Sequence, residues 1–155
     1  MREAQESMAG GVSLSCMYIT WETYQCGNVL SLIVSCGWGF DMNTHSVYLY
    51  DTATGEQMTT AQLLETLQVE PETFLAAVRQ AAAERFDGKY AGIGGDTDEL
   101  VAERRAWTLS DENINLDVMT YADAAGNLYV YLPIGSIAGA AFYEEPLTLD
   151  LGAAG

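Results

Sequence analysis

The first third of the chain alternates apolar and polar side chains in a way that predicts three β-strands. Residues 12–24 and 28–36 are rich in β-branched and aromatic side chains, and the Cys-Gly-Asn step between them is typical of a hairpin turn. The run 45–51 predicts a third strand. Alternation in this strand separates an aliphatic face from an aromatic face, formed by Val47 and Leu49 and by Tyr48 and Tyr50.

Segment 51–55 has two interpretations, a calcium-binding loop or a turn. A calcium loop of the EF-hand kind needs oxygen ligands at alternate positions ahead of its glycine and a glutamate at its far end. The series Asp51, Ala53, Gly55 supplies a single carboxylate. We therefore expect a turn, in which Gly55 takes a positive φ that glycine adopts readily.

Two one-sided helices are predicted in the middle of the chain. A T-x-x-Q capping box, Thr59 with Gln62, starts the first helix over about 60–67. The second runs from Pro71 to about Phe86, with apolar side chains at every fourth position. Because each helix is apolar on one face only, both should pack on the sheet.

The last third returns to strands. Residues 114–118 and 128–134 alternate on either side of a turn, which predicts a hairpin with Tyr129 and Tyr131 opposite its aliphatic face. The sequence PLTLDL at 146–151 predicts a final strand.

Together these elements predict one α+β domain over residues 12–151, with a flexible or disordered N-terminus over 1–11. The predicted order is β-β-β-α-α-(α)-β-β-β, in which a largely antiparallel sheet packs with two or three helices.

Charge narrows the range of partners. The chain holds 22 Asp and Glu residues against six Lys and Arg, for a formal net charge of −16. Nucleic acid and anionic lipid are bound by clustered Lys and Arg, so we expect no nucleic-acid partner. The same charge attracts cationic peptides and proteins, and it also serves simply to keep a protein soluble. No apolar run reaches the ~18 to 20 residues that cross a bilayer, so we expect no membrane insertion by this chain.

The cysteines and the histidine limit the possible chemistry. Cys16, Cys26 and Cys36 are odd in number and lack zinc-ligand spacing, so they predict neither a disulfide-built scaffold nor a metal site. In strand-like runs Cys16 and Cys36 should act as small buried hydrophobes. A single histidine, His45, excludes two-histidine zinc sites within one chain, and we expect it at the surface. The sequence thus predicts no catalytic residue, cofactor or metal.

The aromatic and acidic side chains are the remaining candidates for ligand binding. Tyrosines opposite the aliphatic strand faces form either a half-exposed platform for a glycan or peptide, or a buried layer under a packed element. The adjacent acids near the last strand could serve as the carboxylate pair of a polysaccharide hydrolase. The candidate ligand-binding residues are Trp38, Tyr129, Tyr131, Tyr143, Glu144 and Glu145.

Two segments carry a family resemblance. VLSLIVSCGWGFDMNTHSVYLYDTATGEQMTTAQLL (29–64) and DAAGNLYVYLPIGSIAGAAFYEEPLTL (123–149) resemble the extracellular domain of unknown function in RsiV-type anti-sigma factors and PdaC-like polysaccharide deacetylases of Gram-positive bacteria. The resemblance rests on turn, cap and strand-end residues: Asp51, Thr54, Gly55, Thr59, Ala138 and Gly139.

The resemblance implies an α+β module outside the cytoplasmic membrane that accompanies a sensor or a cell-wall enzyme. The expected function is therefore non-catalytic binding of a wall glycan or a cationic protein in the extracellular space or cell envelope. The alternatives are an envelope polysaccharide hydrolase and a structural module that orients a partner domain. The polar N-terminus, MREAQESMAGG, lacks the apolar core of a secretory signal, which leaves open a cytoplasmic protein or a trimmed piece of a longer chain.

Overall fold

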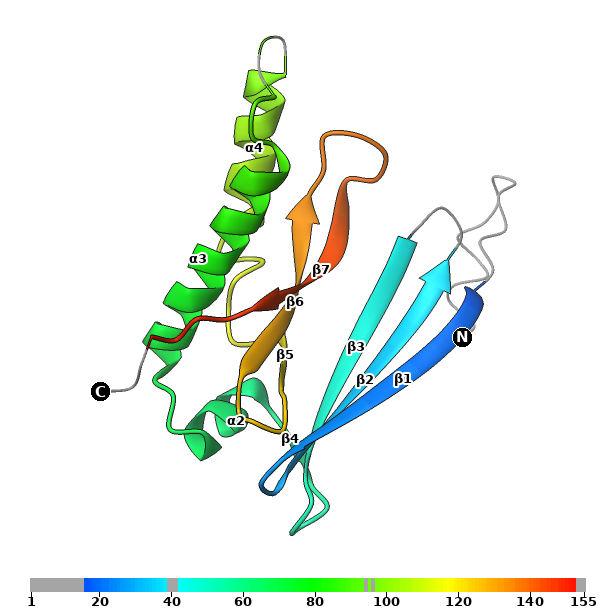
Figure 1. Ribbon diagram of the computed structural model, residues 1–155, viewed down its shortest axis with the longest axis vertical. Coiled ribbons are helices and arrows are strands. Elements are labelled where there is room, and N and C mark those ends of the chain that lie inside the picture. Colours follow the sequence, from blue (N-terminus) through cyan, green and yellow to red (C-terminus); the bar gives the residue numbers. More distant parts are fainter. Residues whose placement is uncertain (1–15, 39–41, 94, 96, 153–155) are drawn as a thin grey trace.

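The computed structural model describes residues 16–38, 42–93, 95 and 97–152 (Figure 1), and the N-terminal segment expected to be flexible lies outside them. Four strands come first, followed by three helices and three strands, which confirms the α+β class and the predicted order with one short strand, β4, added before the helices. The elements are β1 (Cys16–Cys26), β2 (Val29–Trp38), β3 (Met42–Asp51), β4 (Gln57–Met58), α2 (Thr60–Thr66), α3 (Pro71–Lys89), α4 (Asp98–Thr108), β5 (Met119–Ala122), β6 (Leu128–Gly135) and β7 (Phe142–Thr148).

The N-terminal strands form one antiparallel sheet in the order β1-β2-β3-β4. Strands β1 and β2 meet at a two-residue turn in which Gly27 has a φ of 56°. The predicted alternation in β3 is confirmed, since Leu49 is 4% exposed while Tyr48 on the other face is 38% exposed. That outer face also carries Ile19 and Trp21 of β1, both largely exposed.

The turn and capping box that precede the first helix are confirmed. Gly55 has a φ of 77°, and an Asp51 side-chain oxygen accepts the backbone N–H of Ala53 at 2.8 Å. Thr59 caps α2 by accepting the Gln62 backbone N–H at 3.3 Å, and the Gln62 side chain accepts the Thr59 N–H at 2.8 Å. The capping box thereby satisfies two backbone donors at the start of the helix, the N–H groups of Thr59 and Gln62.

The C-terminal strands form a second antiparallel sheet in the order β5-β6-β7, and α3 and α4 cover one of its faces (Figure 1). The aliphatic side chains of β6 point toward these helices, and the apolar stripe of α3 meets them, as the four-residue spacing predicts. The shared core includes Phe74, Val78, Ala82, Phe86, Leu128, Val130, Leu132 and Ile134.

The two sheets meet on the face of the second sheet that the helices leave open. There β3 contacts both β5 and β7, and a smaller buried cluster of Ile33, Tyr121 and Tyr131 lies between the sheets. The strands of the two chain ends are therefore joined by side-chain packing and form separate hydrogen-bonded sheets.

Several element boundaries differ from those predicted. The alternating residues of 114–118 lie in turns ahead of β5, where Ile114 and Val118 fill the core and the Asn115 side chain donates to the Asp111 and Glu112 carbonyls. Helix α3 continues through Gly88 to Lys89. Within the described ranges, no helix is long and apolar enough to cross a membrane.

Candidate functional site

A cavity of about 300 Å³ opens where the start of β3 faces the tip of the β6–β7 hairpin. Its volume is at the lower end of the range that holds small ligands or single side chains. Strand β3 supplies one wall and residues 140–144 supply the other. The lining residues are Asn43, Thr44, Ala140, Ala141, Phe142, Tyr143 and Glu144.

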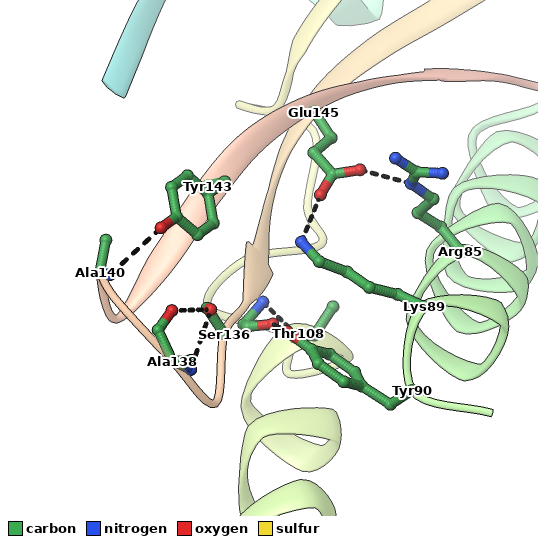
Figure 2. Close-up of polar contacts among 10 residues, drawn as sticks. Arg85, Lys89, Tyr90, Thr108, Ser136, Ala138, Ala140, Tyr143 and Glu145 are labelled. Carbon is green, nitrogen blue, oxygen red and sulfur yellow. Dashed lines mark hydrogen bonds and ion pairs between the residues drawn. The ribbon is translucent and has the colours of Figure 1, made fainter. Parts of the chain in front are cut away.

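The hairpin loop beside the cavity is fixed by local hydrogen bonds (Figure 2). The Ser136 hydroxyl donates to the Ala138 carbonyl at 2.6 Å and accepts the Ala138 N–H at 3.3 Å. The Tyr143 hydroxyl accepts the Ala140 N–H at 3.4 Å. At Gly139, φ is 79° and an added Cβ would lie 2.6 Å from the Tyr143 hydroxyl, so both conformation and space favour glycine there.

Helices α3 and α4 hold the base of the hairpin at Gly135. The Tyr90 hydroxyl donates to the Gly135 carbonyl at 3.1 Å, and the Gly135 N–H donates to the Thr108 hydroxyl at 2.9 Å. Thr108 in turn donates to the Arg104 carbonyl at 2.8 Å. An added Cβ at Gly135 would lie 2.9 Å from that carbonyl oxygen, so the close approach of β6 to α4 requires glycine.

Glu144 joins the two sheets at the wall of the cavity. Its Oε2 accepts the backbone N–H of His45 at 2.7 Å and lies 3.1 Å from the His45 Nδ1. The His45 ring stacks on Tyr131 with centroids 4.0 Å apart. Side-chain exposures of 11% for His45 and 19% for Glu144 show that the contact is mostly covered, so the expectation of a surface histidine is wrong. The His45 side chain is mostly covered because Tyr131 and β7 pack over this end of β3.

Glu145 points to the opposite face of β7, toward α3. Its carboxylate accepts hydrogen bonds from Arg85 and, at 2.8 Å, from Lys89 (Figure 2). Burial alone would raise the pKa of Glu145, but the hydrogen bonds and charges of Lys89 and Arg85 outweigh burial, and the pKa lies below its usual value. The Lys89 Nζ also lies 5.2 Å from the centroid of the Tyr143 ring.

A tyrosine cluster fills the rest of the space between the sheets. Tyr121 stacks on Tyr24, Tyr129 and Tyr131 with centroids 5.0 to 5.9 Å apart. Burial, reinforced by the neighbouring phenols and Glu22, raises the pKa of Tyr121 well above its usual value, so it stays neutral. For Tyr121 and Tyr131, both 8% exposed, this arrangement corresponds to the buried alternative with a second sheet as the packed element, whereas Tyr48 on the outer face is 38% exposed.

The structure brings together some of the predicted site residues and separates others. Tyr143 and Glu144 line the cavity. Trp38 is not among the lining residues; its Nε1 donates to the Thr44 hydroxyl at 3.0 Å on the outer face of the first sheet. Tyr131 is buried behind His45, Tyr129 donates to the Asp123 carboxylate at 3.2 Å, and Glu145 faces α3.

Sequence reasoning missed Asn43, Phe142 and His45. Phe142 is 42% exposed at the cavity, and its ring lies 5.4 Å from Trp107 of α4. The run AAFYEEP contains an aromatic pair beside acids, a signal that could have included Phe142 with Tyr143. Neither Asn43 nor His45 carries a local signal, because each gains its role from a distant hairpin.

The acidic residues of β7 are separated by the geometry of a strand. Glu144 and Glu145 are adjacent, so their side chains point to opposite faces of the sheet, and each already has a partner. They do not face each other across a cleft as a glycosidase pair does. In the part of the chain that the structure describes, no group of three His, Cys, Asp or Glu side chains could hold a metal ion.

Comparison with known protein families gives no match to this sequence, and a search of curated proteins finds no significant relative. The resemblance of segments 29–64 and 123–149 stays a prediction.

Proposed function

We propose that the chain is a non-catalytic binding module whose cavity takes a cationic side chain from a protein partner. The observation that carries the proposal is a ligand-sized, mostly apolar cavity with one carboxylate at its wall, in a chain of net charge −16. Such a site suits Lys or Arg, whose apolar stems pack on hydrophobic side chains while the charged head reaches an acid.

Glu144 supplies the acceptor. Among the described residues, His45 contacts the Glu144 carboxylate through Oε2 alone, which leaves Oε1 to accept a hydrogen bond from a ligand. Phe142 supplies an exposed aromatic ring for the stem or for an Arg guanidinium.

The acidic charge on the rest of the surface also favours a cationic partner. Arg79, Arg85, Lys89 and Arg105 pair with Asp111, Glu145 and Asp87, so four of the six basic residues engage only three of the 22 acids. The large remaining acidic excess would steer a basic protein toward this surface and speed its encounter.

The sequence resemblance supports placing this module in an extracellular or cell-envelope protein. In that setting a wall glycan is the second candidate ligand, because Phe142 with Trp107 forms a partly exposed aromatic surface on which a sugar ring could stack. A purely structural module would bind neither ligand.

A titration with a fluorescent Lys/Arg-rich peptide over a series of NaCl concentrations tests the proposal. Affinity should fall as salt rises. Ala141→Lys places a like charge at the cavity and should weaken binding by about tenfold or more. The matched control Ala124→Lys, at an exposed turn position away from the cavity, changes net charge equally and should have a much smaller effect.

The outcomes separate the candidates. Equal loss in Ala141→Lys and Ala124→Lys would show diffuse attraction to the acidic surface and refute the cavity as the site. Salt-insensitive binding of a neutral chitin oligosaccharide, lost in Phe142→Ala, would favour the glycan. Absence of binding to either ligand would favour the structural module.

A further inference from the structure

Strand β1 begins with an irregularity that changes which face its first residue occupies. From Tyr18 to Cys26 the pairing with β2 is regular, and Ile19 lies opposite Cys36. Between Cys16 and Tyr18 the register shifts, so that Cys16 lies opposite Trp38. Met17 is the extra residue of this β-bulge.

The bulge puts two cysteines on one face. In the unbroken register, Cys16 would share a face with Tyr18, whereas Cys36 shares the opposite face with Ile19. Because of the extra residue, Cys16 instead shares a face with Trp38 and hence with Cys36, two residues along β2.

The two thiols are close and reachable. Cys16 and Cys36 are both half-buried, and Cys16 donates to the Tyr18 carbonyl at 3.2 Å. Burial, the charge of Cys16 and a side-chain hydrogen bond with Cys16 raise the pKa of the Cys36 thiol, in keeping with the diagonal placement of the two cysteines on one face. Cys26 lies at the other end of the hairpin, 3.7 Å from the Cβ position of Gly126.

We infer that Cys16 and Cys36 form an intramolecular disulfide when the chain meets an oxidising disulfide donor, and that this bond ties the start of edge strand β1 to β2. The inference stands on residues separate from the proposed ligand cavity. It also resolves the odd cysteine number, since Cys26 is the thiol left over.

The oxidation consists of two exchange steps. The thiolate of one cysteine attacks the S–S bond of a donor such as oxidised glutathione, which forms a mixed disulfide and releases one donor thiolate. The thiolate of the second cysteine then attacks the mixed disulfide, which forms the Cys16–Cys36 bond and releases the second donor thiolate. The two protons lost by the cysteines end on the two released donor thiols.

The test is a thiol count on the whole chain before and after treatment with a glutathione redox buffer. Free thiols should fall from three to one, with loss of two hydrogen atoms from the intact mass, and peptide mapping should find only Cys26 alkylated. Cys26→Ser should keep the reaction and end with no free thiol. Cys16→Ser and Cys36→Ser should form no intramolecular bond.

Thermal unfolding gives a second measurement. The Cys16–Cys36 disulfide should raise Tm by roughly 5 to 10 °C in the oxidised wild type and in oxidised Cys26→Ser, with no rise in Cys36→Ser. A wild type that keeps three thiols, carries only mixed disulfides with glutathione, or links Cys26 would overturn the inference.

Discussion

The contact between Glu144 and His45 provides the sharpest test of how the two sheets are joined. Strand β4 pairs with β3 only at Leu49 and Tyr50, so His45 lies on a part of β3 that has no strand neighbour on that side. The Glu144 carboxylate accepts the His45 N–H in place of such a neighbour. Replacing Glu144 with Ala leaves this mostly covered donor without its acceptor.

The loss can be estimated from the geometry. A hydrogen bond to a charged acceptor contributes about 1.5–3 kcal/mol, and a neutral one about 0.5–1.5 kcal/mol. Glu144→Ala should therefore destabilise by about 2 kcal/mol and lower Tm by roughly 4–8 °C in a chain of this size. Glu144→Gln keeps an oxygen acceptor without the charge, so its loss should be about half as large.

Urea unfolding at neutral pH, followed by far-UV circular dichroism, measures these changes. Glu65→Ala is the matched control, because Glu65 is exposed and its removal changes net charge by the same amount. Hydrogen exchange at the His45 amide should speed up in Glu144→Ala. If the free energy of unfolding of Glu144→Ala lies within about 0.5 kcal/mol of that of the control, the carboxylate does not join the sheets.

Three further predictions concern β7, the base of the hairpin and the first helix. Glu145→Gln should lower the free energy of unfolding by about 1–2 kcal/mol near neutral pH. Because the folded pKa of Glu145 lies below its usual 4.5, the stability that its carboxylate contributes is present above pH 4.5 and is lost as pH falls through the folded pKa. The free energies of unfolding of wild type and variant, measured in urea, should therefore converge at low pH. A pH-independent gap would contradict this. Gly135→Ala should destabilise by roughly 1–3 kcal/mol through its clash with the Arg104 carbonyl, seen as a lower Tm, and an unchanged Tm would refute the close packing. Thr59→Ala should lower the free energy of unfolding in urea by about 1 kcal/mol, whereas Thr59→Ser keeps the capping hydroxyl and should retain most of that stability. Equal losses in the two variants would argue against the cap.

Features set by neighbouring residues were predictable from the sequence. The capping box of Thr59 and Gln62, the turn closed by Gly55 and the alternation of β3 each depend on a few adjacent positions, and each is confirmed. The strands predicted at 114–118 and 146–151 are displaced in the structure, where 114–118 lies in turns and β7 spans Phe142–Thr148, because alternating apolar residues can fill a core from a turn as well as from a strand.

Features set by distant segments were not predictable. Division of the strands into two sheets depends on which strand ends meet in space, and no local pattern specifies this. His45 lies between two polar residues in the sequence, as a surface residue often does. In the structure it is covered by β7, which lies about a hundred residues later in the chain. Of the residues that line the cavity, the sequence singled out only Tyr143 and Glu144 as candidate ligand-binding residues, whereas the other wall comes from β3.

The two adjacent carboxylates of β7 together explain why the cavity wall is well positioned. Glu144 ties the strand to the edge of the first sheet through His45, and Glu145 ties it to α3 through Lys89 and Arg85. Because neighbouring strand residues point to opposite faces, one dipeptide anchors β7 to both of the layers that enclose it. A wall held from both sides is preorganised, so a ligand that enters the cavity would lose little affinity to ordering the residues that receive it. Binding is therefore linked to stability, because a variant that releases the Glu145 anchor should weaken the ligand site although Glu145 itself faces α3 and not the ligand.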